Sequence, residues 1–264
     1  MKKLGFIGCG NMAKAMIGGM LSSGILKGEE ILVSSRGQEA LQKAAREYGF
    51  CTAANNRDTA QCNGVVLAVK PQFYSQVIDE IKDQVTEHTI IITIAPGWSL
   101  ARLQEAFGKQ VKVARTMPNT PSAVGEGMTA VCCSSNVTKE ELDWVCALMS
   151  SFGKAEVIEE YMMNAVIPVS GSSPAYVYMM IEAMADGAVK EGMPRAKAYQ
   201  FAAQAVYGSA KMVLETGLHP GALKDAVCSP AGTTIEAVAA LEAHGFRSAV
   251  MEAMAVCAKK AREM

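Results

Sequence analysis

The stretch from residue 3 to residue 16, KLGFIGCGNMAKAM, decides the fold. It joins a short apolar run of strand type to a helix-type run through Gly8 and Gly10. In dinucleotide-binding folds the first such glycine permits a tight turn, and the second lets the backbone approach a pyrophosphate on the helix N-terminus. Ala13 stands where a third glycine is usual, and the pattern tolerates this replacement. The stretch therefore predicts a nucleotide-binding turn, with a purely structural glycine turn as the alternative.

The first half of the chain alternates strand-type and helix-type runs. The apolar runs KLGFIG, EILVSS, GVVLAV and TIIITIA each precede a helix-type segment, and VKVART follows the last of these segments. Residues 128–158 add a short strand, a helix and a final strand, KAEVI. Such alternation implies right-handed crossovers and a parallel, doubly wound sheet. We therefore expect an α/β fold with a Rossmann-type domain over residues 1–160.

After Glu160 the strand signals stop, and the remaining sequence has a helical pattern. Glycine or proline at most junctions separates the expected helices, at residues 174–192, 194–216, 220–228, 234–244 and 246–262. Apolar side chains cover so much of each helix that a lone bundle of this size would leave many exposed. We therefore expect residues 161–264 to form an all-helical domain through which the chain associates with a second copy of itself.

The composition argues against several classes of partner. The 264 residues carry a formal net charge of −1, so nothing electrostatic favours nucleic acid or an acidic membrane surface. Residues 161–181 lack charge, but two prolines, a glycine, an asparagine and three serines interrupt them. This interruption favours helices buried by protein over a membrane span.

The eight cysteines show no spacing typical of a metal site, and no leader pattern opens the chain. We therefore expect reduced thiols in a cytoplasmic protein that holds no metal. Most of these cysteines fit small buried hydrophobic positions. The adjacent pair Cys132 and Cys133, and Cys228, are the ones that could have a chemical role.

The end of the second strand predicts which nicotinamide cofactor is used. An Asp or Glu about 20 residues past the glycines would bind a ribose 2′-hydroxyl, whereas Ser34, Ser35 and Arg36 stand there. Hydroxyl groups and a guanidinium suit a 2′-phosphate, so we expect NADPH in preference to NADH. The alternative is that these are ordinary polar residues of a turn. Glu39 lies too far into the next helix to replace the missing acid.

Other strand ends are expected to line the same crevice, because ligands of open α/β sheets bind beyond the carboxyl ends of the strands. The prolines in AVKP and IAPG end two strands, and the loop RTMPNTP ends a third. Lys70 could equally be a solvated lysine, and Asn119 could equally form a structural turn. Together with the first helical residues after the glycines, the expected cofactor contacts are Asn11, Met12, Ala68, Val69, Lys70, Pro71, Ile94, Ala95, Pro96 and Asn119.

The stretch SPAGTTIEAV, residues 229–238, interrupts the helical half. Pro230 and Gly232 break the helix, and Thr233 or Thr234 can cap the next one. Backbone amides at that helix start then point outward unpaired, which favours an anion such as a carboxylate. An ordinary turn between helices, with a threonine cap, is the alternative. The expected substrate contacts are Ser229, Gly232, Thr233 and Thr234.

The motifs GFIGCGNM, LAVKP, MPNTP, SGSSPAY, HPGALKDAVCSPAGTTI and FRSAVMEA follow one another in this order. In order and spacing the chain resembles the Δ1-pyrroline-5-carboxylate reductases over almost its whole length. The resemblance implies an N-terminal Rossmann domain and a helical domain that interlocks with its partner's, with the active site between the domains at the dimer interface. Ser173 and Pro96 depart from the family's usual SGSGPAY and IAG, and the Ser173 hydroxyl could narrow the pocket floor.

The resemblance also implies the last step of proline biosynthesis, in which NAD(P)H delivers a hydride to the imine carbon of 1-pyrroline-5-carboxylate. It implies that Ser34, Ser35 and Asn56 contact the 2′-phosphate side of the cofactor. It further implies that Thr233 and Thr234 hold the substrate, with the Thr234 hydroxyl as the catalytic group near the ring nitrogen. A cyclic imine can arrive already protonated, so a strong protein acid is dispensable. The three histidines are expected outside the cofactor crevice.

Other classes of protein share parts of these patterns. A β-hydroxyacid dehydrogenase would carry a lysine early in the first long helix of the second domain, but the first lysine there is Lys190, near the helix end. YGSAK, residues 207–211, matches the Tyr-x-x-x-Lys pair of short-chain dehydrogenases but lies in the helical half. A catalytically silent NADPH-binding scaffold is the alternative from another class, and a turnover assay separates it from an enzyme.

Overall fold

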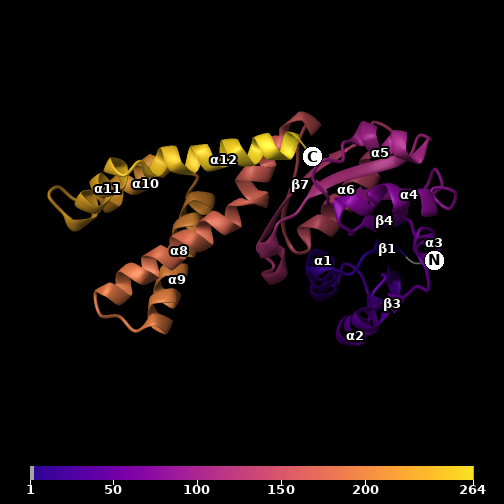
Figure 1. Cartoon of the computed structure of the whole chain (residues 1–264), viewed down its shortest axis with the longest axis horizontal. Coiled ribbons are helices and arrows are strands. Elements are labelled where there is room, and N and C mark those ends of the chain that lie inside the picture. The colour runs from indigo at the N-terminus through magenta and orange to yellow at the C-terminus, as the bar shows by residue number, and fades with distance from the viewer. Residues whose placement is uncertain (1–2, 264) are drawn as a thin grey trace. The chain divides into compact units, whose positions relative to one another are not determined.

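The computed structural model describes residues 3–263 and divides the chain into two compact units (Figure 1). The first unit comprises Met1–Ser172 and Cys257–Met264, and the second comprises Ser173–Val256. The chain therefore leaves the first unit once and returns to it at the C-terminus. The predicted boundary near residue 160 lies earlier than this division, because Met163 and Ile167 are buried in the first unit against Met117.

The first unit is built around an eight-stranded sheet with the order β3-β2-β1-β4-β5-β6-β7-β8. The strands are β1 (Leu4–Ile7), β2 (Ile31–Ser34), β3 (Cys51–Thr52), β4 (Gly64–Leu67), β5 (Ile90–Thr93), β6 (Lys112–Met117), β7 (Gly127–Cys133) and β8 (Gly153–Val157). From β1 the chain adds β2 and β3 on one side, and then β4, β5 and β6 on the other. The point where the order reverses, between β1 and β4, is where such folds bind ligands.

The predicted α/β, doubly wound fold is confirmed, but one strand runs against the expectation. β7 pairs antiparallel with β6, with Ala114 opposite Cys133, while the other neighbouring strands are parallel. The link between β6 and β7 is the short turn η3 (Thr120–Val124), which has no room for the helix that a parallel crossover needs. A fully parallel sheet was therefore wrong for this pair.

Helices and single turns connect the strands of the first unit. The helices are α1 (Asn11–Ser22), α2 (Gln38–Tyr48), α3 (Asn56–Thr59), α4 (Tyr74–Ile81), α5 (Leu100–Phe107), α6 (Lys139–Ser150) and α7 (Met163–Val166). The shorter turns are η1 (Gly28–Glu30), η2 (Pro71–Phe73), η4 (Glu160–Met162) and η5 (Ile167–Gly171), the last a π-helix. Local sequence sets several of these boundaries. Ser99 caps α5 by accepting from the Arg102 amide, and Gly108 ends it in the left-handed conformation.

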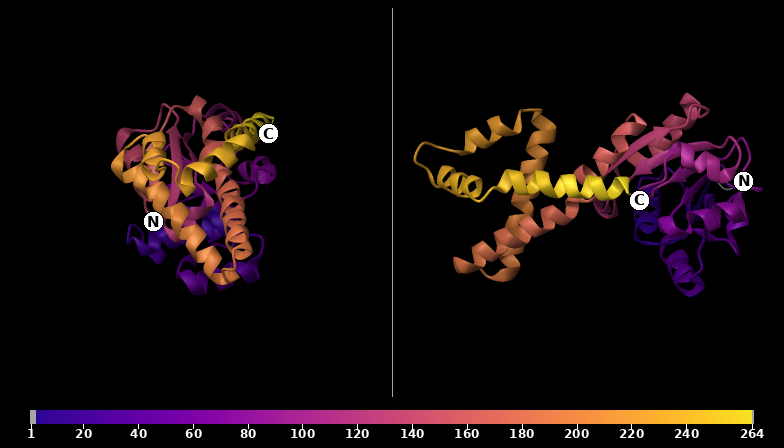
Figure 2. Two further views of the ribbon diagram at one scale, coloured as in Figure 1. Left: turned by 90° about the vertical axis from the view of Figure 1, so that its left-hand side faces the viewer. Right: turned by 45° about the horizontal axis from the view of Figure 1, so that its top comes forward.

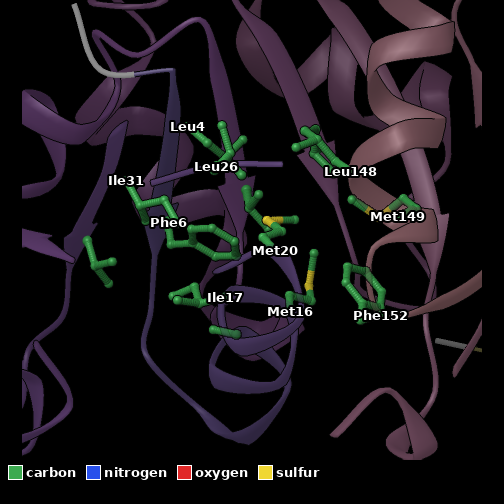
Figure 3. Close-up of a cluster of buried hydrophobic side chains, with 14 of the residues drawn as sticks. Leu4, Phe6, Met16, Ile17, Met20, Leu26, Ile31, Leu148, Met149 and Phe152 are labelled. Atoms are coloured by element: carbon green, nitrogen blue, oxygen red, sulfur yellow. The ribbon is translucent and has the colours of Figure 1, made fainter. Parts of the chain in front are cut away.

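Two apolar layers cover the two faces of the sheet. Successive strand residues alternate between them, since Phe6 belongs to one cluster and Ile7 to the other. Figure 3 shows the first cluster, where Met16 and Met20 of α1 lie near Phe152. Fully burying a side chain such as Phe6 contributes about 1.5–3 kcal/mol, so these layers hold the sheet and its loops in place.

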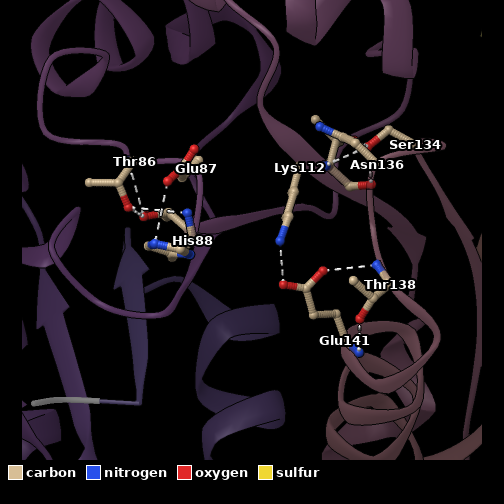
Figure 4. A network of polar contacts seen from close by, with 10 residues as sticks. Thr86, Glu87, His88, Lys112, Ser134, Asn136, Thr138 and Glu141 are labelled. Carbon is tan, nitrogen blue, oxygen red and sulfur yellow. Dashed lines mark hydrogen bonds and ion pairs between the residues drawn. The ribbon is translucent and has the colours of Figure 1, made fainter.

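A polar network fixes the start of α6 at the amino edge of the sheet (Figure 4). Thr138 and Glu141 form a reciprocal capping box, and Lys112 donates to Glu141 Oε1 at 2.6 Å. His88 lies in the loop before β5 and contacts the exposed Glu87. His88 is therefore at the amino ends of the strands, away from the edge where a cofactor is expected.

The second unit is helical, and the five expected helices are confirmed. They are α8 (Ser173–Lys190), α9 (Arg195–Thr216), α10 (Pro220–Val227), α11 (Thr233–Ala243) and α12 (Phe246–Arg262). Helices α8 and α9 pack along each other (Figure 2). The end of α12 belongs to the first unit, where Ala261 is buried and the Cys257 thiol donates to Ser172 Oγ at 3.3 Å.

Large apolar side chains of the second unit are exposed in the single chain. Met179, Phe201 and Leu214 are 69%, 67% and 68% exposed. Exposed apolar surface of this extent is typical of an association surface. None of the helices within residues 3–263 is both long and apolar enough to cross a membrane.

Candidate cofactor and substrate sites

Gly8 lies at the point where the strand order reverses. Its φ of +107° is a conformation that side chains rarely adopt, and an added Cβ would meet the carbonyl oxygen of Ala68 at 2.5 Å. Its amide donates to the Ser34 carbonyl at 2.8 Å. The turn after β1 is thus packed directly between the ends of β2 and β4, which fits the first glycine of a dinucleotide-binding turn.

Gly10 is the N-cap of α1, and no side chain among the described residues caps that helix start. An added Cβ at Gly10 would meet no atom within 4 Å, so this glycine keeps open space rather than close packing. The first amides of α1 and its dipole are therefore available to a phosphate group. Burial raises the pKa of the intervening Cys9, so its thiol stays protonated and adds no charge there.

A cavity of ≈ 680 Å³ lies at the carboxyl ends of β1, β2 and β4. It brings together eight of the predicted cofactor residues: Gly8, Ser34, Ser35, Arg36, Asn56, Ala68, Val69 and Lys70. The other predicted residues do not line it: Gly10, Asn11, Met12, Pro71, Ile94, Ala95, Pro96 and Asn119. Asn11 lines a separate hollow of ≈ 540 Å³ between α1 and η3. Cofactor contacts by these other residues stay predictions.

The mouth of the cavity carries the guanidinium of Arg36. It stacks over the ring of Phe73, 4.3 Å from the ring centroid. This cation–π contact holds an exposed side chain in one place without neutralising it. The cavity thus has a fixed positive charge, as a nucleotide carrying an extra phosphate would require.

A chain of hydrogen bonds crosses the cavity wall from β2 to α4. The Ser34 hydroxyl donates to Asn56 Oδ1 at 2.7 Å, and Asn56 Nδ2 donates to Glu80 Oε2 at 2.8 Å. The end of the second strand indicated Ser34 and the family resemblance implied Asn56, but neither indicated Glu80. The signal for it was the spacing of Phe73, Gln76 and Glu80, which places them on one face of the turn and helix after β4.

Tyr74 connects two strand-end segments that carry predicted cofactor contacts. It is fully buried; its hydroxyl donates to the Leu67 carbonyl at 2.6 Å and lies 3.0 Å from Thr93 Oγ1. Burial raises the pKa of Tyr74, so the hydroxyl remains a donor. The loops that begin at Ala68 and Ile94 are therefore positioned by one side chain.

Asn119 is 8% exposed, and its amide is used within the first unit. Nδ2 donates to the Ser170 carbonyl at 3.0 Å, and Oδ1 accepts from the Met128 amide at 2.9 Å. These bonds join the loop after β6 to η5 and to β7. Asn119 thus has a structural role, through contacts to η5 and β7 rather than through the local turn that the sequence left open.

A partly buried ion pair lies near the start of α5. Arg115 Nη1 is 3.0 Å from Glu160 Oε1, which also accepts from the Leu100 amide at 2.8 Å.

Burial raises the pKa of Cys132 to about 11 and that of the neighbouring Cys133 to about 12. Both thiols are therefore protonated, as expected for buried hydrophobic positions rather than reactive ones. Among residues 3–263, no cluster of three or more His, Cys, Asp or Glu is placed to hold a metal ion.

In the second unit, the interruption at residues 229–232 is a tight turn. The Gly232 amide donates to the Ser229 carbonyl at 3.0 Å, and Ala231 has a φ of 55°. Gly232 is the N-cap of α11, and no described side chain caps it. The expected threonine cap is therefore wrong, because the helix already begins at Thr233 and a cap must precede the first helical residue.

This correction leaves the anion-site geometry in place. The first amides of α11 have no capping side chain, and Thr233 and Thr234 add hydroxyls in the first turn. Thr234 is half-buried, whereas Ser229 and Thr233 are exposed. His219 caps α10, since its Nδ1 accepts from the Gly221 amide at 3.0 Å.

Comparison with known families agrees with this two-part organisation. Residues 160–264 match the family model described as pyrroline-5-carboxylate reductase dimerisation. Residues 3–97 match the model described as NADP oxidoreductase, coenzyme F420-dependent.

Similar proteins cover the whole chain. A pyrroline-5-carboxylate reductase of Escherichia coli is 50% identical over 100% of this chain and 98% of its own length. One from Methanosarcina acetivorans is 39% identical over the same shares. A crystal structure of the Plasmodium falciparum enzyme with NADP bound has a TM-score of 0.90 at 31% identity, covering 99% of this chain and 97% of its own. By these similarities the chain is an oxidoreductase that belongs to the pyrroline-5-carboxylate reductase family.

Proposed function

We propose that this protein reduces 1-pyrroline-5-carboxylate to L-proline, the last step of proline biosynthesis, and that NADPH is preferred over NADH. The observation that carries the proposal is the 50% identity, end to end, with a reductase of that name. The cavity around Gly8 and the uncapped start of α11 supply the two kinds of binding site that the reaction needs. We place the reaction in the cytoplasm, where the cysteines of the chain would stay reduced.

The residues of the first unit fit a dinucleotide. The open space at Gly10 and the free amides of α1 suit its pyrophosphate, while Ser34, Ser35 and Arg36 suit its adenosine end. When bound, the reduced nicotinamide supplies the hydride. Tyr74 holds the two strand-end loops that would orient the ring.

The turn at residues 229–234 would hold the substrate. Backbone amides at the start of α11 would donate to the substrate carboxylate, with the helix dipole adding about 0.3–2 kcal/mol. The Thr234 hydroxyl would donate to the ring nitrogen as the imine carbon receives the hydride. The imine nitrogen gains its proton from water before the hydride arrives, and addition of one hydride to the carbon then converts the protonated imine into the amine of proline without a strong protein acid.

The exposed side chains of the second unit support self-association through its helices. Met179, Phe201 and Leu214 contribute little burial energy to a lone chain because they stay in water, and a second copy can cover them. The family model matched by residues 160–264 is a dimerisation model, which supports the same assignment.

The test is the rate of NADPH oxidation by the purified protein with and without pyrroline-5-carboxylate. We expect a substrate-dependent rate that Thr234→Ala lowers about tenfold or more while leaving the NADPH Kd within about twofold, because one hydrogen bond to the reacting nitrogen is lost. Thr234→Ser keeps the hydroxyl and should recover most of the rate. A rate independent of the imine would refute the proposal and leave a cofactor-binding scaffold.

A further inference from the structure

The wall of the nucleotide cavity contains an acid that no sequence motif indicated. Glu80 lies on the last turn of α4, is half-buried and accepts a hydrogen bond from Asn56 Nδ2 at 2.8 Å. Its backbone carbonyl accepts from Arg57 Nε at 3.2 Å. Contacts to α3 therefore fix both its main chain and its side chain beside the cavity.

The carboxylate sets the direction of the whole hydrogen-bond chain. An ionised carboxylate can accept but cannot donate, so the Asn56 atom that faces Glu80 must be the amide nitrogen. Asn56 Oδ1 must then face Ser34, and the Ser34 hydroxyl must donate to it, as observed at 2.7 Å. The single hydroxyl proton of Ser34 is thus used within the protein.

This direction decides what Ser34 offers to a ligand. With its proton committed, the hydroxyl has only lone pairs left, and lone pairs accept from a ribose hydroxyl but repel a phosphate oxygen. The Glu80 carboxylate adds a negative charge to the same wall, opposed by the Arg36 guanidinium at the mouth. The cavity therefore holds one charge that favours a 2′-phosphate and one that disfavours it.

We propose that Glu80 is a specificity-determining residue for the cofactor. Through Asn56 it holds the Ser34 hydroxyl as a hydrogen-bond acceptor and thereby limits the preference for NADPH over NADH. Glu80 replaces the acid that is missing from the end of β2 and that would favour a ribose 2′-hydroxyl, but it reaches the cavity from α4. This inference rests on the proposed use of a nicotinamide cofactor and deepens it.

The variant Glu80→Gln removes the carboxylate that fixes the direction of the hydrogen-bond chain, with almost no change of shape, because glutamine can either accept from Asn56 Nδ2 or donate to Asn56 Oδ1. A glutamine amide can donate to Asn56 Oδ1, which turns Asn56 Nδ2 toward Ser34 and releases the Ser34 proton for a ligand. The probes are NADPH and NADH themselves, with Kd measured by titration of their fluorescence and with no substrate present. We expect the ratio of the NADH Kd to the NADPH Kd to rise about tenfold, as for one charge-assisted hydrogen bond reversed.

Asp79→Asn is the matched control, because it removes the same charge from the neighbouring position of α4. Asp79 is exposed and pairs with Lys82 at 2.9 Å, outside the cavity lining. The ratio of the NADH Kd to the NADPH Kd for Asp79→Asn should stay within about twofold of the ratio for the unmodified protein, since exposed charges are screened by solvent. An unchanged midpoint of thermal unfolding in both variants shows that the wall is intact.

A Kd ratio for Glu80→Gln that equals the Asp79→Asn ratio would overturn the inference, as would failure of the unmodified protein to bind either cofactor. The proposed function fails separately. Binding of both cofactors without any imine-dependent turnover would refute the reductase but leave the role of Glu80 measurable.

Discussion

Replacing Gly10 by alanine separates cofactor binding from folding more cleanly than other changes at the glycine turn. Gly10 has a φ of −80° and a ψ of −177°, which alanine adopts without strain, and the new methyl group would contact no protein atom within 4 Å. The folded chain should therefore lose at most about 0.5 kcal/mol, the small penalty for alanine at an N-cap. The methyl group instead occupies the space through which a pyrophosphate would approach the amides of α1.

The expected loss is in affinity. Pushing a phosphate out of direct contact removes charge-assisted hydrogen bonds worth about 1.5–3 kcal/mol each, so the NADPH Kd should rise at least about tenfold. Calorimetric titration with NADPH gives the Kd, and urea unfolding gives the free energy of unfolding of the same sample. An unchanged Kd for Gly10→Ala would refute the placement of the pyrophosphate on α1.

Gly8→Ala provides the contrast at the same turn. Its φ of +107° and the 2.5 Å approach of an added Cβ to the Ala68 carbonyl would strain the fold itself. We expect a loss of about 2–5 kcal/mol in the free energy of unfolding, from backbone strain and overpacking together. Equal loss of stability in the two alanine variants would contradict the distinction drawn between the two glycines.

Two further predictions concern buried and half-buried polar groups. Tyr74→Phe leaves the Leu67 carbonyl and Thr93 hydroxyl without their buried partner and should lower the free energy of unfolding by about 1–3 kcal/mol in urea titrations; an unchanged value would contradict the positioning role. Glu141→Gln should lower stability by about 1 kcal/mol at pH 7. Burial raises the pKa of Glu141, but hydrogen bonds from Lys112 and the Thr138 amide outweigh it and hold that pKa below its usual 4.5. Because the pKa of Glu141 is lowered in the folded state, its contribution to stability is complete above pH 4.5 and decreases as the pH falls through the folded pKa. The difference in free energy of unfolding between the unmodified protein and Glu141→Gln should therefore shrink in acid, and a difference that stays constant with pH would contradict this role.

Much of the fold could be predicted because local patterns and global packing agree. The run LGFI is short and apolar, as a buried strand is, and is followed by a glycine turn that side chains disfavour; the structure places it inside the sheet, between β2 and β4. The five helices of the second unit were predictable from glycine and proline at their junctions. The antiparallel β7 was not, because strand direction depends on how the connection packs rather than on the strand's own residues.

The candidate site was predictable where it follows strand ends and less so where it comes from helices. Ser34 was found because it stands at the end of a strand, and Asn56 because the family resemblance implies it, whereas Glu80 reaches the cavity from the end of α4. The start of α11 was predicted to be an anion site, but the cap was assigned to a threonine although Gly232 occupies it. One residue of difference at a helix boundary decides whether a hydroxyl caps the helix or faces a ligand.

Transfer of deuterium from NADPH that carries deuterium at both hydrogens of the nicotinamide C4 tests the central claim most directly. The purified protein is incubated with this NADPH and pyrroline-5-carboxylate, and the product is analysed by mass spectrometry and NMR. The account predicts L-proline that carries deuterium on the former imine carbon, which is the ring carbon bonded to nitrogen that does not carry the carboxylate. Thr234→Ala should form this product more slowly. Proline without deuterium at that carbon, or no proline at all, would contradict it.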